Sequence, residues 1–261
     1  MMNRRDFLAT SAVAATQLGK PHAPLVPEDD PAIVVERVTL RRPDGNVDAY
    51  AAYPKRASAL TPGIVICMHI WGVDAQLRDT VRRFAEAGFN CIAPDLYARN
   101  SPPSGDGTSD IALFKPFATK LVRAQYDGDL RAAALHLTSR SPHGRVGVAG
   151  FCMGGHIALV QALDNADVFA ACAPFYGAVK DIDPLEVHVP ICGSYGEKDQ
   201  SIPADDVRAF RNALRVANDI RIYPNAGHAF FDDTRGAYVA SAAQDAWKRT
   251  IAFFSEQLGL P

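Results

Sequence analysis

The chain has 261 residues, 48% of them hydrophobic, which is enough for one domain with a single large core. Its formal net charge is −2 and it shows no basic stripe, so the sequence gives no support to nucleic-acid binding. No apolar run approaches the ~20 residues that a membrane-spanning helix needs, so no membrane span is expected in the mature protein.

The first residues resemble a bacterial export signal. Arg4 and Arg5 give a basic start, and a mildly apolar, Ala-rich stretch with small-residue sites follows them. The arginine pair and the Asp-Phe-Leu after it are similar to a twin-arginine signal. We therefore predict an export signal and linker over residues 1–30 and a periplasmic location. The alternative is a cytoplasmic protein with an N-terminal extension.

Residues 31–261 are predicted to form one domain in which strands and helices alternate. Strands are predicted at 33–40 and 47–53, joined as a hairpin. The apolar run at 63–69 indicates a strand buried on both faces, and the periodicity of 75–87 indicates a helix. Further strands are predicted at 90–93, 145–149, 169–176, 189–195 and 220–223, and helices at 126–140, 152–163, 203–216 and within 236–258. This alternation predicts an α/β fold with a mostly parallel central sheet and helices on both faces.

Five cysteines are present, and their odd number means that at least one thiol has no intramolecular partner. Four of them lie in apolar, strand-like runs, where a cysteine usually behaves as a small hydrophobic residue. Cys152 alone lies among glycines. No CxxC pair or Cys/His ladder indicates structural zinc, and we predict neither a metal nor a cofactor.

The stretch GFCMG, residues 150–154, lies between a predicted strand and a predicted helix. It has the form G-x-nucleophile-x-G, with cysteine in place of serine. The neighbouring residues must be small because the chain turns sharply at the nucleophile. A helix N-terminus also favours a thiolate. The pattern alone leaves three interpretations open: a nucleophile, a redox or metal thiol, or a small core residue at a tight turn.

Two further loops follow predicted strands of the same sheet. Asp199 lies after the strand at 189–195, and His228 lies after the strand at 220–223. Taken singly, a buried cysteine, a capping aspartate and an exposed loop histidine are all ordinary. Together they occur at the carboxyl ends of strands, in the order nucleophile, acid, histidine that is found in α/β-hydrolases. The combination therefore favours a catalytic site.

At this point the chain resembles the dienelactone hydrolase family, from about Val47 to Leu258. The resemblance is carried by IWGVDAQLRDTVRRFAEAGF, APDLYAR, GFCMGG, FYG, GEKDQSIP, YPNAGHAF and GAYVASAA, a near form of GYVASAA. It implies an α/β-hydrolase fold and the hydrolysis of lactones or small esters without a cofactor.

The resemblance also implies roles for single residues. Cys152 matches the family's nucleophile, Asp199 its acid and His228 its base. The backbone N–H groups of Ile70 and Met153 match the positions of the oxyanion hole. The implied enzyme is a carboxymethylenebutenolidase-type ester or lactone hydrolase.

Two positions depart from the family's best-known branch. His69 replaces a glutamate that holds and then deprotonates the thiol, and Asp232 replaces an arginine that binds the substrate carboxylate. We expect His69 and Asp232 to pair with opposite polarity and to tune the thiol; independent divergence of the two positions is the alternative. We also expect Asp232 to repel a substrate carboxylate. Pocket walls are predicted at Trp71 and Phe230, with weaker candidates at Tyr97, Phe114 and Tyr176.

The sequence therefore predicts a monomeric hydrolase that attacks a small ester or lactone through Cys152. A serine esterase is disfavoured because no serine occupies the elbow. The alternative from another class is a non-catalytic or redox-responsive thiol protein that retains the hydrolase fold. Thiol titration alongside an esterase assay separates these two functions.

Replacing both Arg4 and Arg5 by lysine is expected to leave the precursor in the cytoplasm, because the twin-arginine route reads the arginine pair. Cell fractionation with detection of precursor and mature forms measures this. Uncleaved wild-type protein in the cytoplasm would contradict the export prediction.

Overall fold

The computed structural model describes residues 24–260, so most of the predicted export signal and linker lies outside the described residues. Its centre is an eight-stranded sheet in the order β1-β2-β4-β3-β5-β6-β7-β8. The strands are β1 (Ile33–Leu40), β2 (Val47–Pro54), β3 (Gly63–Cys67), β4 (Asn90–Pro94), β5 (Val146–Phe151), β6 (Cys172–Phe175), β7 (Ser194–Gly196) and β8 (Arg221–Tyr223). Within the described residues, no helix has the length and apolarity needed to cross a membrane.

The predicted sheet is confirmed. β2 runs antiparallel to both β1 and β4, and the remaining neighbours pair in parallel. Every residue of β3, β4 and β5 is buried, as expected for central strands that are covered on both faces.

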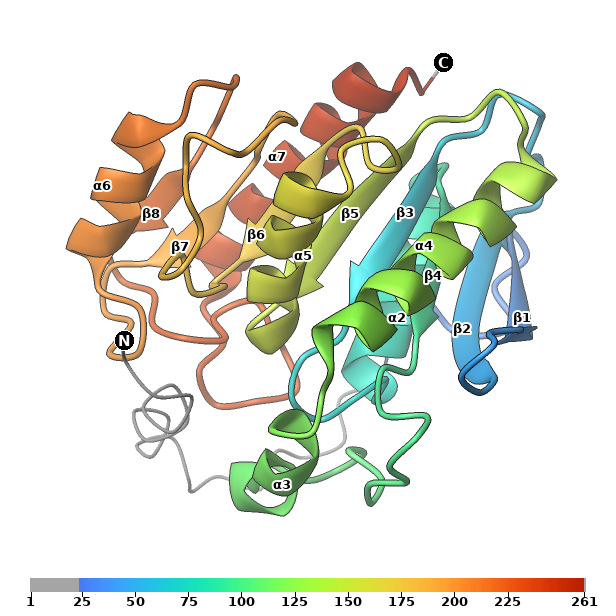
Figure 1. Ribbon diagram of the computed structural model, residues 1–261, viewed down its shortest axis with the longest axis horizontal. Coiled ribbons are helices and arrows are strands. Elements are labelled where there is room, and N and C mark those ends of the chain that lie inside the picture. The colour runs from blue at the N-terminus through green and yellow to red at the C-terminus, as the bar shows by residue number, and fades with distance from the viewer. Residues whose placement is uncertain (1–23, 261) are drawn as a thin grey trace.

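Helices cover both faces of this sheet. Figure 1 shows helices both in front of the central strands and behind them. The front pair is α4 (Arg123–Arg140) and α5 (Met153–Asp164), and the rear pair is α2 (Ala75–Glu86) and α7 (Ala240–Leu258). The rear helices pack together through aromatic rings. The centre of the Phe84 ring on α2 lies 4.7 Å from that of Trp247 and 6.1 Å from that of Phe254, both on α7. The remaining long helix, α6 (Ala204–Ala213), follows β7.

The second half of the sheet differs from the sequence prediction in strand length. The strand predicted at 189–195 is reduced to β7 and to isolated bridges from Ile191 to Cys172 and Asn218. Pro190 accepts a hydrogen bond from the Cys172 N–H but has no N–H to donate, which interrupts the ladder. The loop predicted at 100–110 is present, and two short helices that lack a readable periodicity follow it: η1 (Ile111–Leu113) and α3 (Lys115–Ala118).

The folded unit begins before residue 31, where the sequence analysis placed its start. Val26 is only 2% exposed, and its N–H donates to Asp79 of α2 at 2.9 Å. Its carbonyl accepts from Arg82 on the same helix, and Glu28 accepts from the hydroxyl of Tyr50. The polar, proline-rich composition of this segment gave no indication in the sequence that Val26 is buried.

Asp129 of α4 is a fully buried carboxylate that connects two loops to this helix. It accepts from Arg99 at 2.7 and 2.9 Å and from Arg42 at 3.0 Å.

Asp129→Ala is expected to lower the free energy of unfolding by about 3–5 kcal/mol, because both guanidinium groups lose a buried partner. Asp167→Ala, which breaks an exposed pair with Arg131, should cost less than about 1 kcal/mol. Urea unfolding measures both, and equal losses would contradict the expectation.

Candidate active site

A sharp turn at the end of β5 presents the thiol of Cys152. The residue has φ 56° and ψ −117°, a conformation that side-chain-bearing residues rarely adopt. The flanking glycines allow this turn. A Cβ on Gly150 would lie 2.0 Å from the carbonyl oxygen of Gly154, and a Cβ on Gly154 would lie 2.1 Å from that of Cys67. The predicted elbow is therefore present, with its thiol at the N-terminus of α5.

The structure brings together Cys152, His228 and Asp199. His228 Nε2 lies 3.1 Å from Cys152 Sγ, and its Nδ1 lies 2.7 Å from Asp199 Oδ2. The Asp199 side chain is 2% exposed and also accepts from the N–H groups of Ser201 at 2.8 Å and Ile202 at 3.1 Å. These backbone donors fix the carboxylate, and the carboxylate in turn orients the imidazole.

The electrostatics of this group favour a thiolate beside an imidazolium. Burial acts to raise the pKa of the Cys152 thiol, but the charge and hydrogen bond of His228, the Met153 N–H and the charge of His69 outweigh burial and lower it. Burial likewise acts to lower the pKa of His228, yet the thiolate and Asp199 raise it to about 10. Both shifts favour the thiolate and the imidazolium over the neutral thiol and imidazole.

The two residues predicted for the oxyanion hole lie on neighbouring segments. The Met153 N–H opens α5 and interacts with the Cys152 sulfur. Ile70 lies just beyond β3, and its carbonyl accepts from the Tyr97 hydroxyl at 2.9 Å. The same hydroxyl lies 3.9 Å from Met153 Sδ, so Tyr97 joins the two segments.

His69 contacts a different carboxylate from the one expected. Its Nε2 lies 3.1 Å from Asp74 Oδ1, and no contact with Asp232 is found among the described residues. Its Nδ1 accepts from the Trp71 N–H at 3.3 Å. Burial acts to lower the pKa of His69, but Asp74 outweighs it and raises the pKa. An Nδ1 that accepts from the Trp71 N–H carries no proton, so this contact by itself favours the neutral ring.

Asp232 is paired with an arginine instead. Arg235 donates to Asp232 and also binds Asp74 Oδ2 at 3.0 Å. Its guanidinium carbon lies 3.7 Å from the centre of the Trp71 ring. The repulsion expected from Asp232 is therefore offset by Arg235, whose two terminal nitrogens are already bound to carboxylates.

The two predicted aromatic wall residues have different surroundings. Trp71 lies edge-on to His69, with ring centres 5.3 Å apart, and borders a cavity. Phe230 is fully buried and packs 5.5 Å from Tyr176, whose ring lies 5.3 Å from His228. Phe230 therefore supports the site from within the core, and Tyr176 is the ring next to the imidazole.

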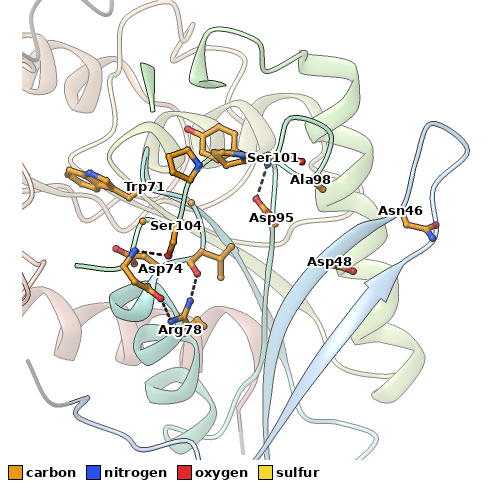
Figure 2. Close-up of a pocket in the computed structure, with 16 residues that line it drawn as sticks. Asn46, Asp48, Trp71, Asp74, Arg78, Asp95, Ala98, Ser101 and Ser104 are labelled. Atoms are coloured by element: carbon orange, nitrogen blue, oxygen red, sulfur yellow. Dashed lines mark hydrogen bonds and ion pairs between the residues drawn. The ribbon is translucent and has the colours of Figure 1, made fainter. Parts of the chain in front are cut away.

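Figure 2 shows the cavity, which has a volume of about 340 Å³. Trp71, Asp74 and Tyr97 line one part of it, and the loop at 101–106 lines another. Asp106 holds this loop in place, because its carboxylate accepts from Arg78 at 2.9 Å and from the Ala75 N–H at 2.6 Å. Neither Cys152 nor His228 lines the cavity, although Trp71, which does, also contacts His69.

Asp74 and Arg235 were missed by the sequence analysis. Asp74 directly precedes α2 and accepts from the Leu77 N–H at 3.0 Å, so its position looks like that of an ordinary helix cap. Its place five residues after His69, on the same strand-to-helix connection, was the signal that could have identified it. Arg235 lies outside every motif and has no comparable signal.

Comparisons with known proteins identify the family to which the chain belongs. Residues 47–258 match the family model described as the dienelactone hydrolase family. A protein of Escherichia coli (strain K12) named as a carboxymethylenebutenolidase is 34% identical over 254 residues, covering 90% of this chain and 92% of that protein. A Methylorubrum extorquens protein with the same name is 33% identical over 274 residues, covering 98% of this chain and 93% of that protein. A crystal structure from Klebsiella pneumoniae, titled as a dienelactone hydrolase, matches with a TM-score of 0.79 at 33% identity, covering 86% of this chain and 99% of that one.

Iodoacetamide is expected to alkylate Cys152 at about pH 6.5, where an ordinary thiol is almost wholly protonated. The rate should decline only as the pH falls through the lowered pKa of this thiol. His228→Ala removes the neighbouring cation and should reduce the rate at that pH at least ~10-fold. Mass spectrometry of the peptide that carries Cys152 measures the reaction, with the exposed His143→Ala as control. Equal rates for His228→Ala and wild type would contradict the ion pair.

Proposed function

Because this chain belongs to the dienelactone hydrolase family and is therefore an ester or lactone hydrolase, we propose that Cys152 is its nucleophile. His228 is the base and Asp199 orients it. One observation carries the proposal: the contact of 3.1 Å from the thiol to the imidazole continues as a contact of 2.7 Å to a buried carboxylate. This arrangement is that of a nucleophile, a base and an orienting acid.

The proposed reaction has two steps. The Cys152 thiolate attacks the carbonyl carbon, and the N–H groups of Ile70 and Met153 stabilise the negative charge that develops on the carbonyl oxygen. The intermediate collapses, the carbon–oxygen bond breaks, and His228 gives its proton to the departing alcohol. A water molecule then attacks the thioester, His228 accepts the proton of the water, and the thiolate leaves as the acid is released.

The substrate class proposed is a small ester or lactone without a required carboxylate. Asp74, Asp232, Arg235 and His69 form a group in which the charges are already paired. A substrate carboxylate would have to displace one of these buried carboxylates from Arg235, which is costly. A neutral substrate meets no such requirement.

The redox alternative has weaker support. The thiol of Cys152 is held against His228 rather than against a second cysteine, and the other four cysteines are buried, free thiols. A redox-sensing thiol is usually accessible and placed beside a resolving cysteine. The contacts of Cys152 therefore favour acyl transfer.

Cys152→Ala is expected to reduce the hydrolysis of a neutral aryl ester by at least ~10³-fold, because no other group at the elbow can attack the carbonyl. Cys152→Ser should retain at most weak activity, since a serine hydroxyl needs a stronger base than a partly ionised thiol does. The turnover number measures this, with the thermal unfolding midpoint as a check on folding. Cys91→Ala, in buried β4, is the matched control. Undiminished turnover in purified Cys152→Ala would overturn the proposal.

A further inference from the structure

Tyr176 leaves the sheet directly beside Cys152. β5 and β6 pair in parallel with Phe151 opposite Phe175, and the Cys152 N–H donates to the Phe175 carbonyl at 3.1 Å. Cys152 and Tyr176 are therefore the next residues along two neighbouring strands. Both have a positive φ, 56° for Cys152 and 37° for Tyr176, which a side-chain-bearing residue rarely adopts. Backbone strain of this kind is concentrated at functional sites, and here it occurs at two adjacent positions.

The backbone around Tyr176 is held on both sides. A Cβ on Gly177 would lie 2.2 Å from the carbonyl carbon of Gly155 in α5, so the two segments approach as closely as only glycines allow. On the other side, the Tyr176 N–H donates to the carbonyl of Ser194 in β7 at 2.8 Å. The position of this tyrosine is therefore fixed by the same central elements that fix the thiol.

The Tyr176 hydroxyl makes no hydrogen bond to any described residue. The residue is 2% exposed, and a polar group with so little access to water is normally paired. Tyr195 in β7 also has an unpartnered hydroxyl, but that group is enclosed in the core. The Tyr176 ring instead packs 5.3 Å from the ring of His228. An unpaired hydroxyl beside the imidazole indicates a partner that arrives with the substrate.

The hydroxyl is a hydrogen-bond donor throughout the pH range of the reaction. Burial raises the pKa of Tyr176 well above its ordinary value, and the negative charges of Asp232 and the Cys152 thiolate act in the same direction. The group therefore keeps its proton while the thiol and the imidazole beside it exchange theirs. A protonated phenol can donate to an oxygen atom of the substrate.

The order of the strands decides which substrate oxygen lies near this hydroxyl. β5 lies between β3 and β6, so Ile70, which follows β3, and Tyr176, which follows β6, lie on opposite sides of Cys152. The proposed oxyanion hole includes the Ile70 N–H. His228 follows β8, on the same side as Tyr176, and gives its proton to the departing alcohol. Tyr176 is therefore on the side of the alcohol oxygen rather than on that of the carbonyl oxygen.

We propose that Tyr176 is a further catalytic residue, whose hydroxyl donates a hydrogen bond to the alcohol oxygen of the substrate as the bond from that oxygen to the acyl carbon breaks. His228 transfers its proton to the same oxygen, and Tyr176 keeps its own proton. This inference rests on the proposed function, in which Cys152 is the nucleophile.

A cysteine nucleophile creates the need for such a donor. The tetrahedral intermediate can expel either the thiolate or the alcohol oxygen, and the weaker base leaves more readily. A thiol has a pKa of about 8.5 and a phenol one of about 10, whereas an aliphatic alcohol is a far weaker acid. Esters of phenols therefore need little assistance at the departing oxygen. Esters and lactones of aliphatic alcohols need a proton and a hydrogen bond there, and they are the substrate class that this inference names.

The experiment compares Tyr176→Phe with wild type on the ethyl ester and the phenyl ester of one acid. Phenylalanine keeps the ring beside His228 and removes only the hydroxyl. The variant should lower kcat/KM, which reports acylation, at least ~10-fold for the ethyl ester and less than ~3-fold for the phenyl ester. Alkylation of Cys152 by iodoacetamide should keep its wild-type rate. Tyr195→Phe also removes an unpartnered hydroxyl from a buried tyrosine, so it is the matched control and should change neither ester rate.

An equal loss for the two esters would place the hydroxyl at the carbonyl oxygen, which both esters share, and would overturn the inference. An unchanged rate for the ethyl ester or a slower alkylation of Cys152 would overturn it as well. Tyr176→Leu, which also lacks a donor, takes the place of Tyr176→Phe if the thermal unfolding midpoint shows that this variant does not fold. Undiminished hydrolysis by Cys152→Ala would overturn the proposed function, whereas unchanged ester rates in Tyr176→Phe would overturn only the role of the hydroxyl.

Discussion

The site depends on the backbone turn at Cys152. Its positive φ is an unfavourable conformation that persists because the surrounding backbone leaves no room for another, with Gly150, Gly154 and the end of β3 in close contact. The turn places the sulfur at the start of α5 and within 3.1 Å of His228. The central strands supply this constraint, so the fold itself determines where the thiol lies.

The hydrogen bonds and ion pairs of the site offset the free-energy cost of burying its charged groups. A thiol, two imidazoles, a guanidinium and three carboxylates belong to the site, and each carboxylate accepts hydrogen bonds from backbone or side-chain donors. Such groups are tolerated in a protein interior only when they are paired.

The sequence predicted the large features of the molecule because they depend on local patterns. Alternating apolar periodicities gave the sheet, and the order of Cys152, Asp199 and His228 placed them at one edge of it. The partner of His69 could not be predicted, because the choice between Asp74 and Asp232 depends on how two loops meet in space. The burial of Phe230 and the packing of Val26 were hidden for the same reason: single side chains that bind distant segments leave no periodic signal.

The most direct measurement of the proposed mechanism is the mass of the enzyme quenched in acid shortly after mixing with a neutral aryl ester. The mechanism predicts that the alcohol is released in the step that acylates the enzyme, before the acid is released. It also predicts that the mass of the acyl group is found on the peptide that carries Cys152, as a thioester. Full turnover with the acyl group on another residue would contradict the cysteine nucleophile.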